Sequence, residues 1–355
     1  MSKSNNNIAI ELIQFNEFNK IKRGCLVFRL HGYNSAISHA YVNSIQRAMM
    51  HYIPIYAFPK QLINLTNIND SEKYKFKYTM PAESQEELIH RFSYTPLFNI
   101  DNNIKLLEDR YIHIDDYSNR QIENIHPDEL NISYTLHCVN DVITNYATKE
   151  NIIYITANSA TIEINNEIVI DMYDRKYAHP VAYLNPGEII RCNMKAVLGI
   201  GKRHDIWSAC TAFYFDINDE EKYPEHYDYT FTIKSYGQIN EKRIMIKSID
   251  YLIEIFVGIG KFIKSEIKKD DEQEYMLDVD HDLTLVNILN YEIQSNDNVI
   301  YSGIINDYKY NGLRIRVKLI NKDVNLNDVL SASINKALDN LHLLRDTFNQ
   351  FINNN

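Results

Sequence analysis

The chain has 355 residues, of which 45% are hydrophobic and 24% are charged, and its formal net charge is −10. This length exceeds one typical hydrophobic core, so we expect two or three globular domains rather than a disordered chain. An acidic surface repels phosphate, so the chain alone is not expected to bind nucleic acid.

The cysteines are scattered singly along the chain and form no pair with the spacing of a metal knuckle: Cys25, Cys138, Cys192 and Cys210. Such cysteines are typical of buried small side chains in a reducing compartment, so we expect an intracellular protein without a metal or other cofactor. No apolar run reaches the roughly 18 residues of a membrane-spanning helix. The first residues lack a secretory hydrophobic region, so neither membrane insertion nor export is expected.

The first hundred residues alternate strand and helix patterns. Residues 8–14 and 25–31 are rich in β-forming residues and predict strands. Ser38 can cap a helix that Pro54 ends. A second helix is predicted from about Glu83 to the residue before Pro96.

Between 101 and 185 the pattern changes to short strands, which predicts an inserted, mostly β domain. Asn165 and Asn166 suit a two-residue hairpin turn between two of these strands. The predicted strands are 111–114, 131–137, 152–157, 160–164 and 167–170.

After the insert, strands are predicted at 188–198, 210–217 and 229–235, followed by a long amphipathic helix at 241–265. The highly charged stretch 264–274 has two readings. It is a linker at 266–274, or its first part continues the helix on a solvated face.

The remaining chain predicts a second α/β unit. Its predicted elements are strand 275–279, helix 283–295, strands 299–306 and 312–320, and helix 326–352. The apolar stripe of the last helix exceeds what one small sheet could cover. We therefore expect this helix to pack against the helix at 241–265.

Four short motifs appear in order along the chain. Asn43 to Pro54 reads NSIQRAMMHYIP, Ile89 to Leu97 reads IHRFSYTPL, Gly199 to Phe213 reads GIGKRHDIWSACTAF, and Asp282 to Asn290 reads DLTLVNILN. The third is the most specific, because a run of glycines, Lys, His, Trp and Ser at this spacing is rare. A fragment YSGI at Tyr301 to Ile304 follows the fourth.

These motifs resemble the RNA polymerase α-type subunits, which comprise the bacterial α subunit, the archaeal D and L subunits and the third and eleventh subunits of eukaryotic polymerase II. The first three motifs are similar to the large partner and the fourth to the small partner, as in the fused proteins of large DNA viruses. Gln46 departs from the first Arg of the family pattern. Leu283, Val286 and Asn290 stand where the small partner has His, Gly and Arg.

The resemblance implies an α+β fold with two α-subunit-type dimerisation modules in tandem. The large, third-subunit-like module would comprise 1–100 and 186–265, and a β-rich insert would occupy 101–185. A linker at 266–274 and a small, eleventh-subunit-like module at 275–355 would follow. The two modules should pair within one chain.

The function implied is that of a non-catalytic assembly subunit of a multisubunit DNA-dependent RNA polymerase. Its partners would be the largest and second-largest subunits and a small zinc-binding subunit, in the virion or host cytoplasm if the source is viral. The sequence contains no acidic metal cluster, phosphate-binding loop or nucleophile motif, so no catalytic residue is expected. Two alternatives are a free-standing adaptor with the same fold and a hydrolase that uses His204 and Asp205. The second is disfavoured by the content of only 10 glycines.

The resemblance and the residue types suggest a set of subunit-interface candidates. Trp207 is a candidate core or interface anchor, and Asn43 and Asn287 are candidate helix braces. Arg47 is expected to face a catalytic subunit, so Arg47→Glu should leave the chain folded, within about 0.5 kcal/mol, but impair assembly. The full set is Asn43, Arg47, His90, Arg91, Lys202, His204, Trp207 and Asn287.

Overall fold

The computed structural model describes most of the chain. The described residues are 8–17, 24–65, 85–98, 129–142, 150–169, 172–173, 178–217, 226–269, 273–306 and 313–354. The strand predicted at 111–114 and the predicted start of the second helix at Glu83 lie outside them.

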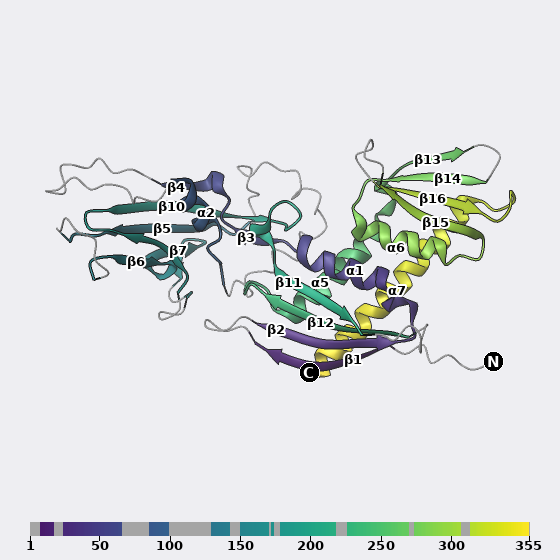
Figure 1. Cartoon of the computed structure of the whole chain (residues 1–355), viewed down its shortest axis with the longest axis horizontal. Coiled ribbons are helices and arrows are strands. Elements are labelled where there is room, and N and C mark those ends of the chain that lie inside the picture. The colour runs from purple at the N-terminus through teal and green to yellow at the C-terminus, as the bar shows by residue number, and fades with distance from the viewer. Residues whose placement is uncertain are drawn as a thin grey trace.

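The first α/β unit is a four-stranded antiparallel sheet with helices on one face (Figure 1). Its strands are β1 (Ile8–Asn16), β2 (Cys25–Gly32), β12 (Tyr227–Ser235) and β11 (Cys210–Asp216), in that order across the sheet. Alternate residues of β2 are buried, because one face of the sheet packs against helices. Helix α1 (His39–His51) contacts β11, and helix α5 (Glu241–Val257) contacts β2 and β12. The strands and first helix predicted here are confirmed, with ends shifted by a few residues.

The second α/β unit has the same plan. Its sheet runs in the order β13 (Ile263–Lys269), β14 (Glu274–Val279), β16 (Leu313–Leu319) and β15 (Val299–Asn306). Helices α6 (Leu283–Gln294) and α7 (Leu326–Asn354) complete it.

The predicted helix at 241–265 is too long, and both readings of the charged stretch need correction. Helix α5 ends at Val257 with Gly258 as its C-cap, and a 3₁₀ turn, η7 (Ile259–Lys261), follows. The chain then forms edge strand β13, which pairs antiparallel with β14. Sheet pairing therefore uses residues that the sequence assigns to a helix or a linker.

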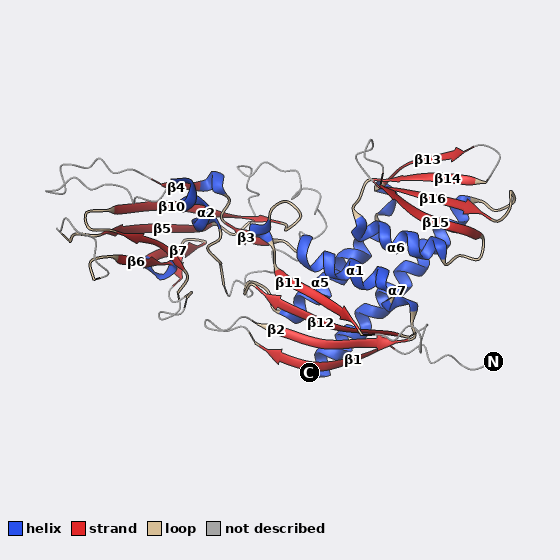
Figure 2. Cartoon of the chain, in the orientation of Figure 1, coloured by secondary structure: helices blue, strands red, loops and turns tan. Residues whose placement is uncertain are grey.

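The helices of the two units form a shared layer between the two sheets (Figures 1 and 2). Within it α5 contacts α7, α1 contacts α6, and both α1–α5 and α6–α7 also pack together. The predicted packing of the two long helices is thus confirmed. Helix α7 also reaches the first sheet, where Phe348 lies edge-on to Phe28 at 5.7 Å between ring centroids.

A β-rich part stands to one side of the helices (Figure 1). Asn165 and Asn166 have φ values of 51° and 68° and form the predicted hairpin turn between β7 and β8. The main sheet has the order β3-β10-β5-β7-β8, with β4 also on β10, while β6 pairs with β9. The elements are β3 (Ile55–Ala57), β4 (Ile63–Leu65), α2 (Gln85–Ser93), β5 (Ile132–Val139), β6 (Ile153–Thr156), β7 (Ala160–Ile164), β8 (Glu167–Val169), β9 (Pro180–Leu184) and β10 (Ile189–Gly199).

This sheet extends beyond the predicted insert, 101–185. Strands β3, β4 and β10 lie outside that range, and β10 pairs with β5 through eight residues from Ile189 to Ala196. Strand β10 is therefore the continuous connection between the β-rich part and the loop that carries the third motif.

Candidate functional site

The third motif forms a loop that packs on the C-terminal end of α1. A Cβ atom on Gly201 would lie 2.3 Å from the carbonyl oxygen of Met50, closer than any ordinary contact. The N–H of Lys202 donates to the carbonyl of His51 at 2.9 Å. Glycine is needed here because only a residue without a side chain lets the loop backbone approach the helix end so closely.

Trp207 lies in the core beneath this loop. Its side chain is buried, and its Nε1 donates to the carbonyl of Val197 at 3.0 Å. A Cβ on Gly199 would lie 2.5 Å from the indole ring. Trp207 thus packs within its own chain, and a role at a subunit interface stays a prediction.

His204 and Lys202 lie on the exposed side of the same loop. His204 is the N-cap of the 3₁₀ turn η6 (Asp205–Trp207), and its Nδ1 accepts from the N–H of Ile206 at 3.2 Å. The Nζ of Lys202 lies 5.1 Å from the ring centroid of Tyr52. Because one imidazole nitrogen of His204 accepts from its own turn, the local geometry favours a structural role over a general base.

Arg47 does not project freely from α1. Its Nη2 lies 3.1 Å from Oδ2 of Asp282, and its Nε donates to Oγ1 of Thr284 at 3.1 Å. The Arg47 and Asp282 side chains are only 29% and 26% exposed. Arg47 therefore binds the start of α6 in the second unit, and the premise that it is a freely exposed charge on α1 is wrong.

Asn43 and Asn287 occupy matching half-buried positions on α1 and α6. The bracing role expected for them stays a prediction.

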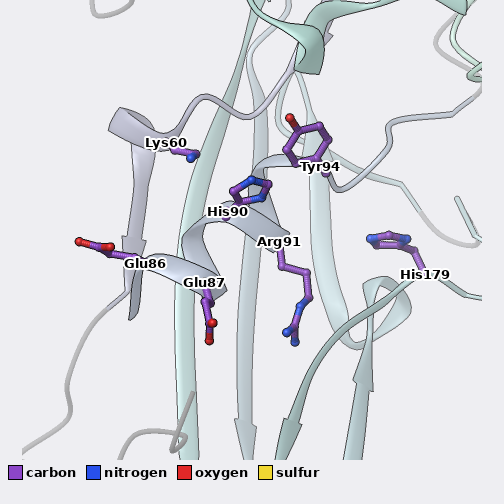
Figure 3. Close-up of a pocket in the computed structure, with 7 residues that line it drawn as sticks. All are labelled: Lys60, Glu86, Glu87, His90, Arg91, Tyr94 and His179. Atoms are coloured by element: carbon purple, nitrogen blue, oxygen red, sulfur yellow. The ribbon is translucent and has the colours of Figure 1, made fainter. Parts of the chain in front are cut away.

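His90 and Arg91 lie on α2 in the β-rich part, apart from the loop of the third motif. They line an open hollow of about 770 Å³ (Figure 3). His90 is exposed and stacks on Tyr94, and Arg91 Nη1 donates to the carbonyl of Val181 at 3.3 Å. Burial, aided by the nearby Arg91, lowers the pKa of His179 on the far side of the hollow. The lining residues are Lys60, Glu86, Glu87, His90, Arg91, Tyr94 and His179.

Sequence reasoning missed the polar residues at the junction between the β-rich part and the first unit. The side-chain oxygen of Gln238 accepts from the N–H of Tyr56 at 3.0 Å, and the side-chain nitrogen of Gln238 donates to the carbonyl of Tyr56 at 2.6 Å. Gln238 thus bonds to Tyr56 as a residue of a neighbouring strand would. The Tyr56 hydroxyl accepts from the N–H of Leu130 at 2.9 Å, and Glu129 accepts from the N–H of Leu198 at 3.0 Å. No sequence pattern marks a glutamine for this task, because its partner lies 182 positions away.

Among the described residues, no group of three His, Cys, Asp or Glu residues could hold a metal ion. None of the described helices is long and apolar enough to cross a lipid bilayer.

No protein-family model matches the chain. The chain is 24% identical over 289 residues to a protein of Acanthamoeba polyphaga mimivirus named "Putative DNA directed RNA polymerase subunit". The match covers 76% of this chain and 74% of the viral protein. A homologue over most of the chain thus carries the name of a viral RNA polymerase subunit, which supports a role in transcription as part of such a polymerase.

Proposed function

We propose that the chain is a non-catalytic assembly subunit of a multisubunit DNA-dependent RNA polymerase. In this role it acts as an intramolecular α-type dimer, and its two α/β units together form the platform on which the two largest subunits assemble. A small zinc-binding subunit is the third expected partner. For a viral source, the place of action would be the virion or the host cytoplasm.

The observation that carries this proposal is the similarity to the mimivirus protein over most of both chains. The shared helix layer supports it, because contacts between α1 and α6 and between α5 and α7 join the two units as two subunits of a dimer would be joined. The net charge of −10 supports binding to protein partners rather than directly to nucleic acid.

The exposed side of the third-motif loop is the best candidate contact with a catalytic subunit. Lys202 and His204 are exposed there, while the glycines and Trp207 behind them fix the loop on α1. The hollow at His90 and Arg91 is the second candidate surface. We rank Trp207 and Arg47 below these exposed residues, because Trp207 is buried and the half-buried Arg47 already binds Asp282.

Purification of the tagged chain from its native source, with identification of bound proteins, tests the proposal. The two largest polymerase subunits should be recovered in equal amounts with the chain. Lys202→Glu should lower their recovery about tenfold, which corresponds to ~1.4 kcal/mol at an interface. Lys322→Glu, a reversal of another exposed lysine in a turn of the second unit, is the matched control and should leave recovery unchanged.

A free-standing adaptor with the same fold is the alternative. Recovery of the chain with other proteins but without any polymerase subunit would favour it and contradict the proposed function.

A further inference from the structure

Helices α1 and α6 cross the boundary between the two units antiparallel to each other, and a polar cluster lies at each end of their contact. At one end, Asp282 at the start of α6 forms a salt bridge with Arg47. Asp282 also accepts a hydrogen bond from the hydroxyl of Tyr52 at 2.8 Å. At the other end, the hydroxyl of Tyr41 donates to Oε1 of Glu292 at 2.6 Å. Each cluster therefore joins a residue of the first unit to a carboxylate of the second.

The cluster around Glu292 is the more deeply buried. The side chain of Glu292 is 0% exposed, and Lys336 Nζ lies 3.2 Å from its Oε2. The amide of Asn340 donates to Glu292 Oε1 at 3.0 Å and to the Tyr41 hydroxyl at 3.1 Å. Burial, followed by the nearby Glu292 charge, raises the pKa of Tyr41, so the hydroxyl keeps the proton that it donates. A buried carboxylate depends on such donors, because its charge is costly without them.

The two units share a helix motif but not these polar residues. Aligning Asn43 with Asn287 equates Ser38 with Asp282, and both are N-cap residues of their helices. The same alignment equates Tyr41 with Leu285 and Ala48 with Glu292. The polar residues are thus complementary between the units and are not repeated in both.

A pair of like units would lack this complementarity. In a pair of two second units, Glu292 would lie opposite Leu285 and lose the hydroxyl donor. In a pair of two first units, Tyr41 would lie opposite Ala48, and Arg47 would meet Ser38 in place of a carboxylate. A pair of second units removes the hydroxyl donor from the buried Glu292, and a pair of first units removes the carboxylate from the buried Tyr41, which disfavours each like pair relative to the mixed pair.

We propose that these two clusters are selectivity elements, which make the first unit pair with the second unit and reject the corresponding unit of a second copy of the chain. The proposal concerns pairing within this chain and does not depend on the polymerase role. Replacing Tyr41 and Glu292 of the buried cluster by apolar residues should then keep the fold but allow like units to pair as well.

The test uses the full chain with a protease site inserted at Gly260, where an added Cβ atom would have no other heavy atom within 4 Å. After cleavage, the protein is unfolded in urea and refolded, and native mass spectrometry counts mixed and like pairs of the two pieces. The wild type should give mixed pairs only. The double variant Tyr41→Phe/Glu292→Leu should give like pairs in a share at least about tenfold above the detection limit that bounds the wild type, the factor for a preference weakened by ~1.4 kcal/mol.

Tyr41→Phe alone is the matched control, because the retained Glu292 still disfavours a pair of second units. Like pairs from the wild type, or a folded double variant that gives mixed pairs only, would overturn the proposal. Failure of the intact double variant to fold would also overturn it, since the cluster would then serve stability rather than the choice of partner. Thermal unfolding of the intact variants detects that outcome.

Discussion

Replacing Gly201 by alanine tests whether the third motif is built around close packing on α1. The new Cβ would lie 2.3 Å from the Met50 carbonyl oxygen and 3.2 Å from Oγ of Ser208, whereas ordinary contacts are 3.4–4 Å. A backbone oxygen cannot rotate away as a flexible side chain can. The loop must therefore move outward, by about 1 Å on ordinary contact distances.

The expected cost combines two effects. Overpacking of a well-packed site costs about 1–3 kcal/mol. Outward movement also weakens the bond from the Lys202 N–H to the His51 carbonyl, which contributes about 1 kcal/mol. We expect Gly201→Ala to lower the free energy of unfolding by about 2–4 kcal/mol and the thermal midpoint by roughly 5 °C.

Calorimetry or circular dichroism of the purified chain measures this midpoint. Gly258→Ala is the control, because the nearest atom to its Cβ would be the Glu254 carbonyl oxygen at an ordinary 3.5 Å. Its φ of −91° also suits alanine, so its midpoint should stay the same or rise slightly. Equal midpoints for Gly201→Ala and the wild type would refute the claim that the motif requires glycine for close packing.

Three further variants test other contacts. Arg47→Glu should destabilise the chain by about 2–4 kcal/mol in urea unfolding, since it places a second carboxylate beside Asp282; a loss below about 0.5 kcal/mol would contradict the contact. Burial raises the pKa of Asp282, but hydrogen bonds from His281 and Thr284 outweigh it and hold this pKa well below 3.8. Its charge therefore stabilises the fold above about pH 4, and this stabilisation is lost as the pH falls. The stability gap between wild type and Asp282→Asn should shrink below pH 4, and a constant gap from pH 7 to 3 would exclude this. Phe348→Ala should cost about 3–5 kcal/mol by thermal or urea unfolding, and an unchanged midpoint would mean that α7 does not pack on the first sheet.

The elements of both α/β units could be predicted because their periodicity is local. Alternation in β2 and the apolar stripes of α1, α6 and α7 reflect burial of one face, which a short window of sequence records. The end of α5 could not be predicted in this way. Phe262 and Ile263 continue the apolar helical spacing, and only the pairing of β13 with β14 makes the following residues a strand.

The structure of the charged stretch 264–274 could not be predicted for a related reason. Lysine and glutamate are common in linkers and on solvated helices, but they are also common in edge strands, where charge discourages pairing with other chains. Strand β13 is such an edge strand. Gly258 and Gly260 are stop signals for the preceding helix and carry more information than the charge.

The candidate site could be predicted in its residues more than in their roles. The rare spacing of the third motif marks a single loop, in which the glycines and Trp207 fix the position of the loop on α1 rather than form its surface. The role of Arg47 depends on Asp282, 235 positions away, and no local pattern could reveal that contact. Glu292 offered a signal that sequence reasoning missed, since a lone carboxylate within the apolar helix LTLVNILNYEIQ suggests a buried partner.

The reach of α7 across both units affects the order in which the chain can fold during synthesis. Phe28 lies in the second strand, yet the ring that packs against it belongs to Phe348, 320 residues later (348 minus 28). At about 5–20 residues per second, a ribosome needs roughly 15–60 s to make the intervening chain. Throughout that interval this apolar patch of the nascent sheet has no cover from α7, so we expect the emerging first half to be more prone to aggregation than the finished chain.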